Sequence, residues 1–268
     1  MSKISSFQIE AINDAESSEN RIHSDEIAEK YGFKGALVSG VNVFGYLSQP
    51  LVHFYGEEFL NQCVMEVRFL KPAFQHDLIT IQTDSLESEK KFRYHISKAF
   101  NQTGELLAHM ESWLPINTEP ANELSSMSEG SEILERKEIE WDLIELHKAS
   151  PIYAWEPAQE DNLERVHSQR DGAEIYQGDN AYIHPYYLLD ACNKALMRMF
   201  ILPAWIHVGS KLILRSPIKI NQKLAMSAIP VKKWTRKGHQ FIELYICVRR
   251  EGKVVLEAEH TAIFKIAS

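Results

Sequence analysis

The same short pattern occurs twice in this chain, and its two occurrences are spaced like copies of one unit. Arg21-Ile22-His23-Ser24 reappears as Arg165-Val166-His167-Ser168, 144 residues later. Two further pairs keep nearly the same offset: Pro72 with Pro217 at 145 residues, and the turn residues Gly104 and Gly252 at 148. Chance matches would scatter in their spacing. A unit of this length present twice predicts a duplicated domain, because a solenoid needs several short repeats.

Composition excludes several classes of protein. The chain has 268 residues, of which 44% are hydrophobic and 25% charged, the balance of an ordinary globular protein. Its formal net charge is −8 and no basic run is longer than a pair such as Lys232-Lys233, so we expect no nucleic-acid partner. No apolar run reaches the roughly 18 residues of a membrane span, and we expect no membrane partner.

The termini and cysteines give an expectation of compartment. The N-terminus lacks the apolar core of a signal peptide. Cys63, Cys192 and Cys247 are odd in number, far apart and without metal-site spacing, so we interpret them as reduced, packed thiols. These features predict a cytoplasmic protein without a metal site.

In the first copy, the pattern predicts one long buried helix among strands. The stretch Val41–Phe54 is apolar nearly all round, which is typical of a buried helix, and Pro50 predicts a kink or a break in it. A short helix is expected at Asp25–Tyr31. Strands are expected at Phe7–Ile12, Cys63–Phe69, Leu78–Thr83, Phe92–Phe100 and Glu105–Leu114.

The second copy repeats this order after a polar, acidic linker. Its helix is expected at Tyr186–Phe200, and its strands at Lys211–Leu214, Lys223–Ile229, Phe241–Arg249 and Val254–Phe264. We therefore predict an α+β fold with an N-terminal domain at 1–115, a linker at 116–137 and a C-terminal domain at 138–268. In each domain an antiparallel sheet would wrap around a long central helix.

The region around His23 resembles the MaoC-like enoyl-thioester hydratases. That family carries Asp-x-Asn-Pro-x-His, then x-Asp, and about fifteen residues later a loop ending in His-Gly. Here Asn20, His23, Asp25, Phe33 and Gly40 match, while Ser18 replaces the family's catalytic Asp and Ser39 replaces the loop His. The resemblance covers about the first 115 residues. It implies a hotdog fold, present twice, with the two copies pairing edge to edge in one sheet.

The second half resembles a different part of the superfamily. His184-Pro185, followed by Leu188-Leu189-Asp190-Ala191, is similar to the helix that supplies the catalytic Asp of polyketide-type dehydratases. One extra residue precedes Leu188, and Lys194 stands where that family has Gln or His. The helix is also similar to that of hotdog thioesterases, in which an acidic residue directs a water molecule.

These residues suggest a composite site. His23 is the candidate base, because its unperturbed pKa lies near working pH, and Asp190 is the candidate acid from the other copy. The backbone N–H groups of Gly40 and Val41 open the first buried helix and could hold a thioester carbonyl. Asn20, Ser39 and His184 complete the expected substrate-binding set. The alternative is a site wholly within the second copy, built from His167, His184 and Asp190.

Three functions remain open from the sequence. The first is a hydratase or dehydratase acting on an acyl-CoA or acyl-carrier-protein thioester, favoured by the His23 motif, and contact between His23 and Asp190 in one pocket would support it. The second is a thioesterase that uses Asp190. The third is a non-catalytic acyl-binding subunit, favoured because neither half keeps a complete motif, and an Asp190–Lys194 ion pair would support it. No separate cofactor is expected, since CoA or phosphopantetheine would enter as part of the substrate. An acyl carrier protein and a second copy of the chain are the candidate partners.

Overall fold

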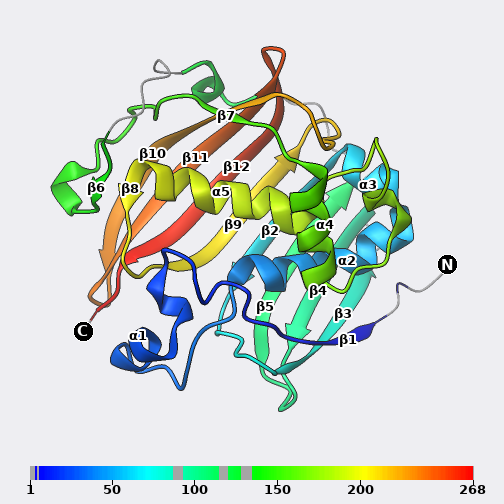
Figure 1. Cartoon of the computed structure of the whole chain (residues 1–268), viewed down its shortest axis with the longest axis horizontal. Coiled ribbons are helices and arrows are strands. Elements are labelled where there is room, and N and C mark those ends of the chain that lie inside the picture. Colours follow the sequence, from blue (N-terminus) through cyan, green and yellow to red (C-terminus); the bar gives the residue numbers. More distant parts are fainter. Residues whose placement is uncertain (1–3, 5, 87–92, 115–119, 128–134, 268) are drawn as a thin grey trace.

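The computed structural model describes residue 4 and residues 6–86, 93–114, 120–127 and 135–267. Ten strands of these residues form one sheet in the order β1-β3-β4-β5-β2-β9-β12-β11-β10-β7 (Figure 1). The strands of its first half are β1 (Phe7–Glu10), β2 (Cys63–Phe69), β3 (Leu78–Leu86), β4 (Arg93–Phe100) and β5 (Leu106–Leu114). Those of the second half are β7 (Tyr153–Trp155), β9 (Ile206–Leu214), β10 (Leu224–Arg236), β11 (His239–Arg250) and β12 (Lys253–Lys265).

The strand order is the same in both halves when each is followed outward from the middle. In the first half the order from the centre is β2, β5, β4, β3, β1, and in the second it is β9, β12, β11, β10, β7. Each half thus begins with its edge strand, continues through a long helix and then lays down four antiparallel strands. This correspondence agrees with a unit present twice in the chain.

Strands β2 and β9 join the two halves. They pair antiparallel from Cys63 opposite Leu214 to Arg68 opposite Gly209. A Cβ atom added at Gly209 would lie 2.8 Å from the carbonyl oxygen of Val67, so only glycine fits the backbone at this point. The sheet is therefore continuous across the joint.

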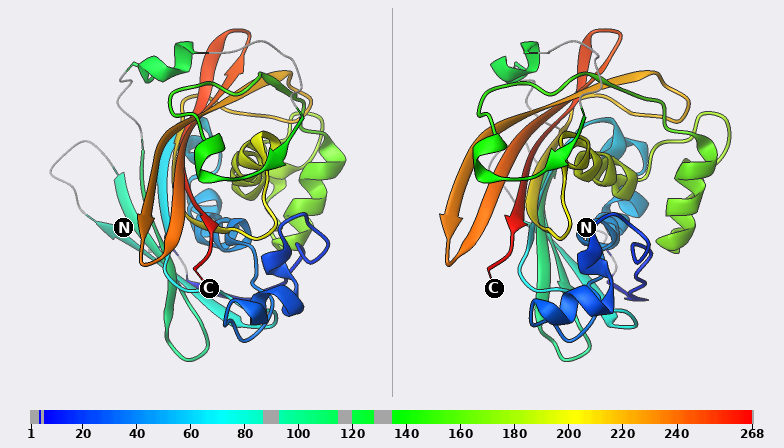
Figure 2. Two further views of the ribbon diagram at one scale, coloured as in Figure 1. Left: turned by 90° about the vertical axis from the view of Figure 1, so that its left-hand side faces the viewer. Right: turned by 60° about the vertical axis from the view of Figure 1, so that its left-hand side comes forward.

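Two long helices, α2 (Gly40–Tyr55) and α5 (Pro185–Met199), pack on one face of the sheet and contact each other (Figure 2). Most of their side chains are buried, including Phe44, Leu47, Leu188 and Leu196. Helix α4 (Gln159–Ser168) lies on the far side of α5 from the sheet. Apolar residues of both helices and of the sheet belong to one hydrophobic core.

Short elements complete the fold. They are the helices α1 (Asp25–Lys30) and α3 (Glu57–Asn61), the 3-10 turns η1 (Arg21–His23), η2 (Glu123–Ser126), η3 (Trp141–Leu143) and η4 (Glu174–Tyr176), and a parallel pair of β6 (Lys137–Glu138) with β8 (Phe200–Ile201). Among the described residues, no helix combines the length and the apolar character needed to span a membrane. The three cysteines are free and buried, as expected.

Several expectations from the sequence need correction. Helix α2 continues through Pro50 without the predicted break. Strands β9 and β10 are longer than predicted, and α4 was not predicted. The two Arg-x-His-Ser segments also differ in structure, because the first lies on the buried turn η1 whereas the second lies on α4 with His167 exposed. Half of the predicted linker, 116–119 and 128–134, falls outside the described residues, and the domain boundaries stay predictions.

Candidate functional site

His23 lies in a cavity of about 250 Å³ at the N-terminus of α2. The first half contributes Asn20, Ser39 and Gly40 to its wall, together with the ring of Phe69. The second half contributes Asn193 of α5 and the start of β9; the lining residues there are Trp205, Ile206, His207 and Val208. The cavity is thus built from both halves of the chain.

The hydrogen bonds of His23 define its tautomer. Its Nδ1–H donates to the carbonyl oxygen of Leu37 at 2.7 Å, since a carbonyl can only accept. Its Nε2 therefore carries the lone pair, which accepts a longer bond of 3.3 Å from the side-chain amide of Asn20. Burial lowers the pKa of His23, and the Leu37 carbonyl and the Asp14 carboxylate oppose this more weakly. At neutral pH the imidazole is a neutral base with its basic nitrogen turned to Asn20.

Asn20 links the turn that carries His23 to the second half through hydrogen bonds. Its side-chain amide also donates to the carbonyl of Trp205 at 3.0 Å, and its oxygen accepts from the Trp205 N–H at 3.1 Å. The Arg21 N–H donates to the carbonyl of Pro203 nearby. With so many partners, the turn has a fixed position relative to β9, and so does the His23 ring.

The N-terminus of α2 supplies donors beside the imidazole. Ser39 is the N-cap residue, and its hydroxyl makes no capping bond. The N–H groups of the first helical turn have no acceptor inside the helix, and they carry the positive end of its dipole. The ring of Phe69 lies so close to Gly40 that a Cβ there would meet it at 3.2 Å. Val41, expected to bind substrate, is buried and does not line the cavity.

Asp190 lies elsewhere, which corrects the expected pairing with His23. It is absent from the cavity lining, whereas Asn193, one helical turn further along α5, is part of it. The Asp190 carboxylate instead accepts from Lys194 Nζ at 2.9 Å and from Arg165 Nη2 at 3.2 Å. The sequence reasoning missed Asn193 because the family pattern pointed to Asp190. The extra residue between Pro185 and Leu188 does not by itself indicate that Asn193, and not Asp190, lines the cavity.

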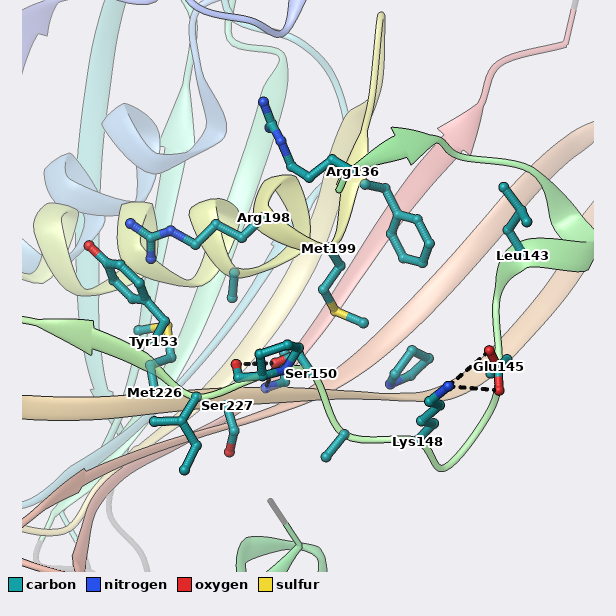
Figure 3. A pocket seen from close by; sticks show the side chains of 17 residues that line it. Arg136, Leu143, Glu145, Lys148, Ser150, Tyr153, Arg198, Met199, Met226 and Ser227 are labelled. Atoms are coloured by element: carbon teal, nitrogen blue, oxygen red, sulfur yellow. Dashed lines mark hydrogen bonds and ion pairs between the residues drawn. The ribbon is translucent and has the colours of Figure 1, made fainter. Parts of the chain in front are cut away.

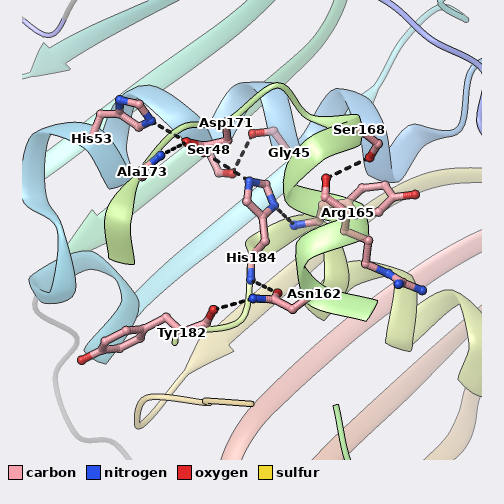
Figure 4. A network of polar contacts seen from close by, with 11 residues as sticks. Gly45, Ser48, His53, Asn162, Arg165, Ser168, Asp171, Ala173, Tyr182 and His184 are labelled. Carbon is pink, nitrogen blue, oxygen red and sulfur yellow. Dashed lines mark hydrogen bonds and ion pairs between the residues drawn. The ribbon is translucent and has the colours of Figure 1, made fainter. Parts of the chain in front are cut away.

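His184 is also outside the cavity. It is the N-cap residue of α5, and its Nδ1 accepts from the Tyr186 N–H at 3.0 Å. Its Nε2–H donates to Asp171 Oδ2 at 3.3 Å, while His53 of α2 donates to Asp171 Oδ1 at 2.7 Å (Figure 4). Both ring nitrogens of His184 are thus occupied, and the side chain is fully buried. Its role in the structure is to cap α5 and to link the two halves, together with Asp171, which the sequence reasoning also missed.

The alternative site within the second copy does not assemble. His167 is exposed on α4, whereas His184 is fully buried at the start of α5 and Asp190 is bound by two cations.

A second histidine, His207, lines the His23 cavity and was not among the candidates from the sequence. Burial and the neighbouring His260 lower the pKa of His207 well below its usual value. Its Nε2 is 2.8 Å from the Ser210 hydroxyl, which in turn contacts His260 Nδ1 at 2.9 Å.

A scan against protein-family models and a search of curated proteins each gave no match. Solved structures do match over nearly the whole chain. One is a protein described as a MaoC domain dehydratase from Chloroflexus aurantiacus, with a TM-score of 0.68, 10% identity and coverage of 100% of this chain and 97% of that one. Another is a conserved hypothetical protein from Mycobacterium tuberculosis, described as a double hotdog, with a TM-score of 0.69, 11% identity and coverage of 98% and 96%.

The similar structures also include an acyl-ACP thioesterase from Bacteroides thetaiotaomicron, with a TM-score of 0.54, 10% identity and coverage of 96% and 97%. At such identities the similarity establishes the fold. The resemblance to MaoC-like hotdog proteins is therefore confirmed at that level, and the chain has an α+β hotdog fold.

Proposed function

We propose that this chain is a double hotdog that hydrates an enoyl thioester or dehydrates a 3-hydroxyacyl thioester at His23. The observation that carries the proposal is the neutral His23 imidazole, which lines a cavity at the N-terminus of a buried helix and whose basic Nε2 accepts only a long bond of 3.3 Å from Asn20. A buried base beside backbone N–H donors is the arrangement that proton abstraction next to a thioester carbonyl requires.

In the proposed dehydration, His23 acts twice. Its Nε2 takes the proton from the carbon next to the thioester carbonyl, and the N–H groups at Gly40 hold the oxygen on which negative charge develops. The imidazolium then returns its proton to the hydroxyl on the adjacent carbon. The C–O bond breaks, the double bond forms and water leaves. One imidazole serving as base and acid compensates for Ser18 at the position of the family's carboxylate.

The remaining polar residues would orient the substrate. Ser39 has a hydroxyl without a capping bond, and Asn193 has a buried side-chain oxygen without a partner in the described structure. Both line the His23 cavity. We propose that they bind the hydroxyl or the thioester of an acyl-CoA or an acyl-carrier-protein substrate, so that CoA or phosphopantetheine enters with the substrate.

The test is turnover of crotonyl-CoA, 3-hydroxybutyryl-CoA and octanoyl-CoA, with absorbance of the enoyl group and release of free thiol recorded in parallel. We expect the enoyl absorbance to change without thiol release. His23→Ala should lower kcat/KM by about 10²- to 10⁴-fold, the usual contribution of a positioned general base. His167→Ala is the matched control, since His167 is exposed on α4. Full activity in His23→Ala with loss in His167→Ala would reject the proposal.

A second function, acyl-thioester binding without turnover, is favoured by one observation. Asp190 forms the ion pair with Lys194 that a structural role predicts. Saturable binding of octanoyl-CoA with no change in either recorded signal would support this binding role. Release of thiol would instead support a thioesterase, the class of the similar protein from Bacteroides thetaiotaomicron.

A further inference from the structure

A second and larger cavity lies in the C-terminal half, away from His23. Its volume is about 490 Å³, within the range of small-molecule sites. It is enclosed by the C-terminal end of α5, the first half of β10 and the segment 143–153 (Figure 3). It shares no lining residue with the His23 cavity.

The walls of this cavity are mostly apolar. Helix α5 contributes Ala195 and Met199, and Met226 and Ala228 of β10 lie across from them. Met199 points into the middle of the cavity in Figure 3. Methionine side chains adapt to flexible chains of varied shape. These walls fit a hydrocarbon chain.

One cation in the wall forms no ion pair with a described residue. Lys148 pairs with Glu145, and Arg136 pairs with Glu19. Arg198 forms no ion pair with any described residue, and its guanidinium instead stacks on the ring of Tyr153. Partial desolvation lowers the pKa of Arg198, while Tyr153 and the Asp190 carboxylate oppose this more weakly, and the guanidinium stays charged at neutral pH. A guanidinium that lines the cavity and forms no ion pair with a described residue can bind an incoming carboxylate.

We propose that this cavity binds the carboxylate of a medium-chain fatty acid, with the head group on Arg198 and the chain along Met199 and Met226. The planar guanidinium matches a carboxylate bidentately, and the stacked Tyr153 ring holds it in place. The site is independent of the reaction proposed at His23.

The experiment is titration calorimetry of the whole protein with dodecanoate, and with dodecanol as the uncharged probe. We expect one dodecanoate per chain, and binding of dodecanol at least about tenfold weaker, because a charge-assisted pair contributes that much. Arg198→Gln should weaken dodecanoate binding by a similar factor, and Arg198→Lys should restore part of it. Arg68→Gln, at an exposed arginine of β2, is the matched control and should bind as the parent does.

Three results would overturn the proposal. They are no saturable dodecanoate binding, equal binding by Arg198→Gln and the parent, and binding abolished by Val38→Trp, which fills the His23 cavity, but retained by Arg198→Gln. Circular dichroism of each variant identifies those that do not fold. Because Arg198 is exposed on the end of α5, its polar variants are expected to fold.

Discussion

At the scale of single residues, Asp171 is a buried carboxylate that depends on its hydrogen-bond partners. Its side chain is fully buried and accepts from two histidines and from the Ala173 N–H. Burial alone would raise the pKa of Asp171, but the hydrogen bonds from His184 and His53 together lower it. The carboxylate is therefore charged in the folded protein and holds α2, α5 and the preceding loop together.

We predict that Asp171→Asn lowers the free energy of unfolding by about 3 kcal/mol, because removing one partner leaves buried polar groups uncompensated. His53→Ala should cost less than about 1 kcal/mol, since His53 is half-exposed and water can replace it. Urea denaturation of the two variants measures both values. An Asp171→Asn variant as stable as the parent would contradict this account.

Some site residues could be predicted from the sequence and others could not. Asn20, His23, Ser39 and Gly40 lie together because they belong to one continuous motif that folds locally. Asn193 and His207 join them only through the pairing of β2 with β9 and the contact of α2 with α5. No local pattern encodes which of Asp190 and Asn193, one turn apart, faces the cavity.

At the scale of elements, the close contact of α2 with the second half depends on a glycine, Gly45, which has no side chain. A Cβ at Gly45 would lie 2.0 Å from Oε1 of Gln169, a residue that is itself buried. Gly45 is the sixth residue of α2, and Asp190 is the sixth residue of α5. The two central helices differ at this point, because Gly45 allows close packing whereas Asp190 forms an ion pair with Lys194.

We predict that Gly45→Ala destabilises the protein by about 1–3 kcal/mol through overpacking, although alanine is the better helix former. Gln169→Ala in the same chain should restore most of that loss, because it removes the clashing amide. Thermal unfolding of the two single variants and the double variant gives the coupling. Purely additive effects would show that the contact does not limit packing here.

The elements themselves were largely predictable. Helices α2 and α5 follow from long apolar runs, and most strands of the sheet from alternation. The exceptions are β9 and β10, which are several residues longer than predicted, and the short edge strand β7, which has no predicted counterpart. Helix α4 was missed because its sequence is mostly polar and only two of its residues, Asn162 and Val166, are buried. The proline in α2 is accommodated because packing on all sides stabilises the helix around it.

At the scale of the whole molecule, buried neutral histidines set a pH dependence of stability. Burial lowers the pKa of His95 to about 4 and that of His260 to about 3. Between those values and about 6.5, the unfolded chain binds protons that the folded chain does not. The free energy of unfolding should therefore fall as the pH drops below about 6.5, by about 1.4 kcal/mol per pH unit for each such histidine.

Urea denaturation at pH 7, 6 and 5 measures this dependence. His53 acts in the opposite direction, because its hydrogen bond to Asp171 raises its pKa. His260→Gln should reduce the pH dependence by about 1.4 kcal/mol per unit, while leaving stability at pH 7 lower through lost packing. An unchanged slope in that variant would mean that His260 titrates normally in the folded protein.

The pairing of β2 with β9 within one chain affects which substitutions the sequence can tolerate. When two separate subunits meet at such a joint, each substitution appears on both sides and the assembly falls apart on dilution. Here both partners are tethered, so the joint holds at any concentration. A residue in one half can therefore differ from the residue at the same place in the other half, as do the N-cap residues Ser39 of α2 and His184 of α5. The two halves can thus differ in sequence while β2 and β9 stay paired.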